Sequence, residues 1–319
     1  GPCAMRRAQL KRAGLRFNRG LIERLQRSLT ASKRCCVSCP PLDAPRRMVI
    51  EAAERQRLEQ EHGCTGPALL GRLLTHFRVK DLAHPPISNF HVGAVALGAS
   101  GNVYFGVNVE FPGHPLSATI HAEQFIMASA ALRGESGLTH LVVNAPPCGH
   151  CRQLLNEMDG AARLGVHVVA ADGSLSSTGH PQLLPQDFGP AHLSNDSGLL
   201  ASEANHSLAL PVQHKQLKEL GDEALRAANR AYAPYSECPA GVALRLDDGQ
   251  VFGGHYIESC AFNPSLPPLQ VAVVNAMAHG ALTSLHQVRE IALVELARSK
   301  VSFARTTYIG NARFHLMHA

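Results

Sequence analysis

The chain has 319 residues, of which 45% are hydrophobic and 17% charged, and it contains no Trp. This length allows two domains of ordinary size, and no apolar run approaches the ~20 residues that a membrane-spanning helix needs. The formal charge of +5 is uneven, because residues 1–47 carry twelve Lys/Arg and two acids, which leaves −5 for residues 48–319. A mildly acidic body argues against a broad nucleic-acid-binding surface.

Residues 1–47 are interpreted as a basic leader that we expect to be disordered. Their Arg-rich, acid-poor composition also fits an organelle transit peptide. The nine cysteines are odd in number and form no regular pairs along the chain, which favours a reducing, intracellular compartment. We therefore expect a cytoplasmic protein, or an organellar one if the leader is a transit peptide. Three cysteines are predicted to be buried thiols: Cys64, Cys238 and Cys260.

Residues 48–172 have the element pattern of one α/β domain. Apolar spacing predicts a helix over 67–77, a hairpin of two strands and a second helix that begins at a Thr119 cap and ends near Arg133. A further helix is predicted over 148–158. The predicted strands are 91–97, 103–110, 141–144 and 166–170.

Two short motifs of this domain carry metal chemistry. His121 and Glu123 are separated by one residue, and Cys148 and Cys151 follow as a Cys-x-x-Cys pair after Pro146-Pro147. A hydrolytic zinc site takes three protein ligands and leaves the fourth position for water, and H-x-E…P-C-x-x-C is the signature of zinc deaminases that act on nucleobases. The pattern predicts His121, Cys148 and Cys151 as ligands of one Zn²⁺ per chain, with Glu123 as the catalytic acid and base. Taken alone, the Cys pair also fits a redox pair, and His-Ala-Glu fits an exposed helix surface.

The motifs around this pattern give the chain a family resemblance. Ile87-Ser-Asn-Phe-His-Val-Gly-Ala94 precedes an Asn-x-Glu at Asn108 and Glu110, and the His-Ala-Glu-Gln and Pro-Cys-Gly-His-Cys-Arg-Gln phrases follow. The segment 84–188 resembles cytidine deaminase of the two-domain, homodimeric kind found in enterobacteria and plants. Similarity runs over most of residues 48–319 and does not cover 1–47. The resemblance implies two tandem three-layer α/β/α domains with mixed sheets.

The resemblance also implies roles for individual residues in substrate binding. Phe90 would stack on the pyrimidine, Asn108 and Glu110 would bind the ribose hydroxyl, and Ala122 would offer its backbone to the base. Phe188 matches a Phe that reaches the active site of the partner subunit. Without the resemblance, Asn108 and Glu110 fit an ordinary polar pair at a strand end, and Phe90 fits a core residue.

The remainder of the chain contains an internal repeat. Residues 173–211 are interpreted as a linker because they begin with a Gly/Ser-rich stretch, and 212–319 as a second domain. Ala83, Pro86, Ser88 and Gly93 recur 148 residues later as Ala231, Pro234, Ser236 and Gly241. In this second copy the metal motif is lost, since Pro267 and Leu269 replace His121 and Glu123 and no Cys pair follows. We expect a catalytically degenerate domain, in which Phe262 either lies near a neighbouring active site or packs in the core.

The combined hypothesis is a zinc-dependent cytidine deaminase of pyrimidine salvage that acts on cytidine and deoxycytidine as a homodimer. A zinc-bound hydroxide would attack C4 of the base, with Glu123 as the proton shuttle. No membrane or nucleic-acid partner is expected. The alternatives are a deaminase of cytosine in a nucleotide or polynucleotide, and a non-catalytic scaffold stabilised by zinc.

Overall fold

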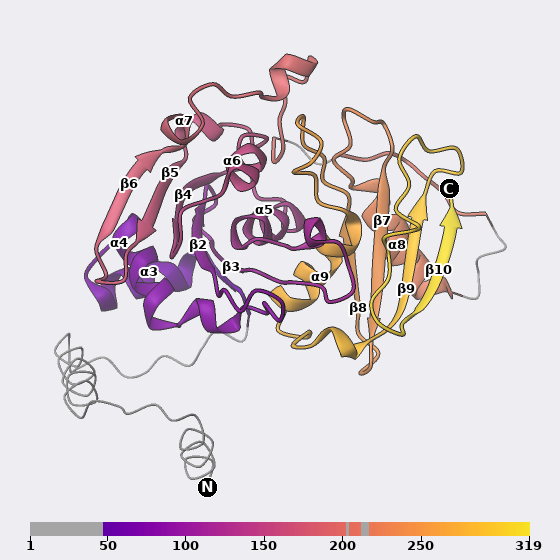
Figure 1. Cartoon of the computed structure of the whole chain (residues 1–319), viewed down its shortest axis with the longest axis horizontal. Coiled ribbons are helices and arrows are strands. Elements are labelled where there is room, and N and C mark those ends of the chain that lie inside the picture. Colours follow the sequence, from indigo (N-terminus) through magenta and orange to yellow (C-terminus); the bar gives the residue numbers. More distant parts are fainter. Residues whose placement is uncertain (1–46, 202–203, 212–216) are drawn as a thin grey trace, which may run out of the picture. The chain divides into compact units, whose positions relative to one another are not determined.

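The computed structural model describes residues 47–201, 204–211 and 217–319, which are arranged in two mixed β-sheets (Figure 1). The predicted basic leader, apart from Arg47, lies outside the described residues. No helix within the described ranges is long and apolar enough to cross a membrane.

The first sheet has six strands in the order β1-β3-β2-β4-β5-β6. Strands β4 and β5 run parallel, and the other neighbouring pairs run antiparallel. The strands are β1 Val49–Ile50, β2 Gly93–Gly98, β3 Val103–Val107, β4 Leu138–Val143, β5 Gly165–Val169 and β6 Leu175–Gly179. The helices of this domain are α3 Ala52–His62, α4 Gly66–His76, α5 Ala122–Leu132, α6 Gly149–Leu155 and α7 His180–Leu183.

Helices cover both faces of this sheet, as the side chains of β3 show. The Phe105 ring packs against the Phe77 ring at the end of α4, with centroids 5.8 Å apart. The neighbouring Gly106 points to the opposite face, where a Cβ would lie 2.2 Å from the Ala122 carbonyl oxygen of α5. Glycine therefore lets α5 approach the sheet closely, and the predicted three-layer α/β/α arrangement is confirmed.

The second sheet repeats the central four strands of the first. Its order β10-β9-β7-β8 corresponds to β5-β4-β2-β3, and β9 and β10 are again the parallel pair. The strands are β7 Ala240–Leu246, β8 Val251–His255, β9 Val288–Glu295 and β10 Arg313–His318, and the helices are α8 Lys218–Asn229 and α9 Pro268–Ala278. Gly254 repeats Gly106, because a Cβ there would lie 2.0 Å from the Ala272 nitrogen of α9. The predicted internal repeat is confirmed.

Helix α6 of the first domain has no counterpart in the second. In the first domain α6 connects β4 to β5. In the second domain residues 296–312 make the corresponding connection between β9 and β10 without any helix. The repeat therefore lacks the element whose start carries the Cys pair.

The two domains pack through α5 and α9. Arg230, at the end of α8, donates to the carbonyl oxygens of Ala131 and Leu132 at the end of α5, at 3.4 and 3.2 Å. The Met48 N–H in turn donates to the Ala278 carbonyl at the end of α9, at 2.9 Å. Each domain thus satisfies backbone acceptors at a helix end of the other.

The start of the predicted linker 173–211 is wrong. Strand β6 lies inside it and forms the edge of the first sheet by antiparallel pairing with β5, and α7 follows directly. The Gly/Ser-rich composition suggested a loop, but pairing with a neighbouring strand supplies the backbone hydrogen bonds that this polar segment needs.

A second correction concerns Cys64, which is half-buried, whereas Cys238 and Cys260 are buried as expected.

Candidate active site

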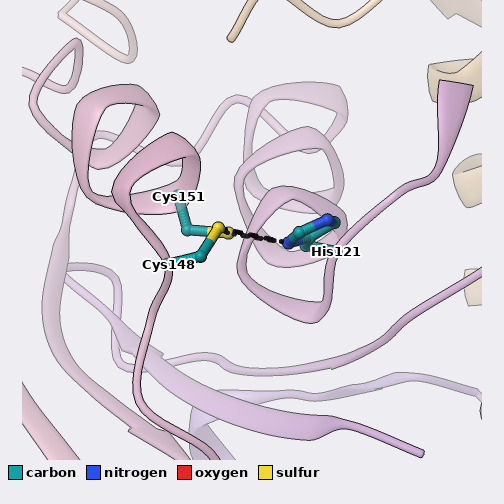
Figure 2. Close-up of side chains that lie close together, drawn as sticks. All are labelled: His121, Cys148 and Cys151. Carbon is teal, nitrogen blue, oxygen red and sulfur yellow. Dashed lines mark hydrogen bonds between the residues drawn. The ribbon is translucent and has the colours of Figure 1, made fainter. Parts of the chain in front are cut away.

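The three predicted metal ligands lie together, from two different helix starts (Figure 2). The Nδ1 atom of His121 is 3.5 Å from the Cys148 Sγ and 3.3 Å from the Cys151 Sγ, and the two sulfurs are 3.6 Å apart. Both thiols are free. Within the described residues, no other group of three or more His, Cys, Asp or Glu side chains converges in this way.

These distances fit a tetrahedral zinc ion. Zn–S bonds of ~2.3 Å and a Zn–N bond of ~2.0–2.1 Å at tetrahedral angles place ligand atoms about 3.5–3.8 Å from one another. One imidazole and two thiolates also give a formally neutral site, so no additional cation is required nearby. His121, Cys148 and Cys151 would hold the metal, and the fourth position would remain for water or substrate.

The starts of two helices position all three ligands. His121 is the N-cap of α5, and its backbone N–H donates to the Gln124 Oε1 at 2.8 Å. Cys148 is the N-cap of α6, and Cys151 lies in the first turn of that helix. The expectation that both ligand groups sit at helix amino termini is confirmed, although α5 is capped by His121 and not by Thr119. The positive ends of two helix dipoles therefore meet at the thiols and favour their thiolate form.

The ionisable groups of the cluster influence one another strongly. The hydrogen bond between the two sulfurs lowers the pKa of Cys148 to about 4 and raises the pKa of Cys151. Glu123, in the first turn of α5, is only 4% exposed, and this burial raises its pKa. A carboxyl in such surroundings holds a proton more readily than an exposed Glu, as a proton carrier requires.

Asn108 and Glu110, both buried, hold the loop that precedes β2. The Asn108 side chain accepts from the Val92 N–H at 2.9 Å and donates to the Phe90 carbonyl at 2.8 Å. The Glu110 carboxylate accepts from the backbone N–H groups of Ile87 and Ser88, at 2.7 and 2.9 Å, and from the Ser88 hydroxyl. These three bonds lower the pKa of Glu110, although burial alone would raise it. In this structure the two residues therefore shape the loop that carries Phe90.

The other predicted substrate residues are placed in different surroundings. Phe90 is 61% exposed, so the core interpretation of this residue is wrong, whereas Ala122 is fully buried between His121 and Glu123 at the start of α5. The Phe188 ring stacks on His192 with centroids 4.9 Å apart, and its carbonyl accepts from a side chain of α6. The structure therefore places Ala122 and Glu123 next to the metal ligands, and Asn108 and Glu110 against the loop that carries Phe90. The contacts of Phe188 involve neither group.

Ser88 is a residue of this region to which the sequence analysis gave no role. Its hydroxyl donates to Glu110 and its oxygen accepts from the Phe90 N–H at 3.1 Å, so it joins the carboxylate to the loop. The signal was available, because Ser88 and Glu110 both recur in the repeat. There Glu258 accepts from the backbone N–H groups of Tyr235 and Ser236, at 2.8 and 3.1 Å.

The equivalent position in the second domain is filled by other side chains. Pro267 is the N-cap of α9, where His121 caps α5, and Leu269 is buried at the position of Glu123. Tyr256, which replaces Asn108, packs its ring 4.7 Å from that of Phe303. Phe303 comes from the helix-free connection 296–312 and is buried.

Comparisons with known proteins point to one family. Residues 74–168 and 181–308 each match a family model described as the cytidine and deoxycytidylate deaminase zinc-binding region. The chain is 41% identical over 256 residues to the protein named Cytidine deaminase 6 of Arabidopsis thaliana, which covers 76% of this chain and 86% of that protein. It is 46% identical over 223 residues to a cytidine deaminase of Photobacterium profundum, covering 70% and 72% of the two chains. Among solved structures, a cytidine deaminase of Burkholderia pseudomallei aligns over 39% of this chain and all of its own, at 27% identity and a TM-score of 0.36.

Proposed function

The chain belongs to the cytidine deaminase family, and we propose that it converts cytidine and deoxycytidine to uridine and deoxyuridine with release of ammonia. The observation that carries this proposal is the meeting of His121, Cys148 and Cys151 beside the buried carboxyl of Glu123, which interacts with the Cys151 side chain. A purely structural zinc site has no use for a carboxyl group that is not a ligand. The scaffold alternative is therefore disfavoured.

Glu123 is the residue that moves protons in this proposal. Zinc, when bound by the three ligands, supplies the acidity that makes water a nucleophile near neutral pH. The Glu123 carboxylate accepts a proton from that water and donates it to N3 of the base. It then accepts the proton of the hydroxyl newly bound to C4 and donates it to the leaving amine, as the C4 carbonyl of the product forms. Its burial supports the role, because the raised pKa keeps the carboxyl ready both to hold and to release a proton.

Asn108, Glu110, Phe90 and the Ala122 backbone are proposed to bind the nucleoside. Glu110 accepts three hydrogen bonds from its own chain, and a carboxylate has about four acceptor positions, so one remains for a ribose hydroxyl. The exposed Phe90 ring, on the loop that Glu110 and Asn108 hold, is available to stack on the pyrimidine.

The second domain is proposed to be catalytically degenerate, which gives one zinc and one active centre per chain. Its Pro267 and Leu269 offer neither a ligand nor a proton. We further propose a first domain that begins at residue 48 and includes β6 and α7, a second domain over residues 212–319, a cytoplasmic location and a homodimer. Phe188 and Phe262 are proposed to approach the partner's active site, since the two residues are 42% and 65% exposed. Light scattering during gel filtration tests the dimer.

One assay separates the candidate substrates. Loss of ultraviolet absorbance is followed with cytidine, deoxycytidine, dCMP and a cytosine-containing oligonucleotide, each with and without a zinc chelator. We expect turnover of the two nucleosides that the chelator abolishes. Turnover of dCMP or of the oligonucleotide in preference to the nucleosides would replace this proposal by the nucleotide or polynucleotide alternative. Zinc retention without turnover of any substrate would favour the scaffold.

A further inference from the structure

A buried carboxylate joins the two domains just past the end of the helix that starts with the Cys pair. Glu157 follows the end of α6 and is completely buried. Its Oε1 accepts hydrogen bonds from the hydroxyls of Tyr232, at 2.8 Å, and of Tyr235. Its Oε2 accepts from the Cys260 backbone N–H at 2.8 Å. All three donors belong to the second domain, although Glu157 belongs to the first.

The tyrosine hydroxyls are fixed as donors. Burial and the neighbouring Glu157 carboxylate raise the pKa values of both Tyr232 and Tyr235, so the two hydroxyls keep their protons. The Asn195 side-chain N–H in turn donates to both hydroxyl oxygens, at 2.7 and 3.2 Å. A buried carboxylate needs such donors because it has lost its hydration water. The charge on Glu157 is therefore compensated mainly by the second domain.

The element that Glu157 anchors is the short helix with the zinc ligands. Helix α6 has only seven residues, too few to be stable by itself, so contacts at its ends must hold it. At its start the Arg152 Nε donates to the Pro147 carbonyl at 2.8 Å. At its end the Gln153 side chain donates to the Phe188 carbonyl at 2.6 Å, and Glu157 makes the three bonds to the second domain.

The donors come from the part of the second domain that corresponds to the substrate loop. At the repeat distance of 148 residues, Tyr235 corresponds to Ile87, which lies in the loop held by Glu110. In the second domain that same loop is held by Glu258, and its Tyr235 hydroxyl donates to Glu157, just past the end of α6. The loop that is proposed to face the nucleoside in one copy thus contacts, in the other, the residue that follows the metal-bearing helix.

We propose that Glu157 is a positioning residue, through which Tyr232 and Tyr235 of the second domain hold α6 so that Cys148 and Cys151 stay in place for zinc. This inference rests on the proposed zinc site. According to this proposal, the second domain supports the metal site of the first domain, although the second domain has no metal ligands of its own. Groups that hydrogen-bond the ligands of a metal site commonly change metal affinity by about 10- to 100-fold when they are substituted, and Glu157 acts one step further away, so we expect an effect at the low end of this range.

The test is the rate at which the full-length chain releases zinc to a chelating dye. Glu157→Gln keeps the size of the side chain and removes the charge, and we expect about tenfold faster release. Tyr232→Phe removes one donor and keeps the ring, and we expect a smaller acceleration in the same direction. This second variant also serves if Glu157→Gln does not fold.

Glu135→Gln is the matched control. Glu135 is also a buried carboxylate that accepts from a tyrosine, Tyr104, at 3.0 Å, but all of its donors lie in the first domain and away from α6. Urea unfolding measures how much stability each variant loses, so that the two Glu→Gln variants can be compared at equal stability. We expect Glu135→Gln to release zinc at the wild-type rate. Equal acceleration in Glu135→Gln, or a normal rate in Glu157→Gln and Tyr232→Phe, would overturn the proposal.

A second readout does not depend on the metal. Hydrogen exchange of the amides of residues 149–155 is compared in the zinc-free forms of the wild type, Glu157→Gln and Glu135→Gln. We expect about tenfold faster exchange in this segment for Glu157→Gln alone, and unchanged exchange there would refute the positioning role. If the wild type binds no zinc, but exchange in residues 149–155 is still faster in Glu157→Gln alone, the proposed function is refuted. The role of Glu157 in holding α6 would then still stand.

Discussion

The start of α9 lacks a backbone hydrogen-bond donor, and from this we predict how one substitution changes the stability of the protein. In the first domain the Gln124 Oε1 accepts from the N–H of the N-cap residue His121 at 2.8 Å. The equivalent Gln270 is 8% exposed, and its Oε1 has no hydrogen-bond partner. The reason is chemical, because the N-cap of α9 is Pro267, which has no N–H.

Replacing Pro267 by Ala should therefore stabilise the protein. The new N–H would satisfy a buried acceptor whose lack of a partner costs about 1–3 kcal/mol. Loss of the proline makes the unfolded chain more flexible, which costs about 0.4–1 kcal/mol. Ala tolerates the backbone angles at this position, φ −55° and ψ 149°, without strain. The expected net gain in the free energy of unfolding is about 1 kcal/mol.

Urea unfolding of a four-member cycle measures this gain. The members are the wild type, Pro267→Ala, Gln270→Leu and the double variant. We expect the gain of Pro267→Ala in the wild-type background and its disappearance in the Gln270→Leu background, where no acceptor remains. A gain of equal size in both backgrounds, or no gain in either, would refute the hydrogen-bond reasoning.

Four further outcomes test the site and the fold. Cys148→Ala should lose both zinc, by metal analysis of the purified chain, and turnover, and a variant that keeps a full complement of zinc contradicts the ligand assignment. Glu123→Ala should keep zinc and lose at least about 100-fold in kcat, so near-normal turnover excludes its role as proton carrier. Glu110→Ala and Glu258→Ala should each lose about 2–4 kcal/mol in urea unfolding, since each carboxylate holds two backbone N–H groups, but only Glu110→Ala should lose kcat/KM. Burial lowers the pKa of His255 to about 3, whereas the same side chain in the unfolded chain binds a proton near pH ~6.5. As the pH decreases from 6.5, the free energy of unfolding should therefore decrease by up to about 1.4 kcal/mol per pH unit. His255→Gln should flatten this slope between pH 6.5 and 4.5, and an unchanged slope would refute the contribution.

The sequence predicts the metal cluster well because its signal is local. His121, Cys148 and Cys151 lie at helix starts whose positions follow from capping and apolar spacing. The repeat likewise reveals the second domain, since both copies keep the glycines where a helix approaches the sheet. Local chemistry therefore suffices for the three ligands and internal symmetry for the two domains, whereas the three-layer arrangement followed from the family resemblance.

Other features depend on partners that are distant in the sequence. Helix α3 was not predicted because it is mostly polar and buries only Leu58, so it lacks an apolar period. Strand β6 was interpreted as a loop because its pairing with β5 is invisible in its composition. The donors of Glu157 lie 75, 78 and 103 residues further along the chain, so the residues next to Glu157 in the sequence do not predict them.

The helix-free connection 296–312 determines how the second domain could regain a metal. Pro267→His and Leu269→Glu would return an imidazole and a carboxyl to the start of α9. Neither substitution would supply sulfur, because the connection contains no helix start on which a Cys pair could be spaced, and Phe303 occupies the space against Tyr256. Point substitutions cannot reverse the change, and an engineered chain with two metals would need the whole segment 296–312 replaced by the residues that connect β4 to β5.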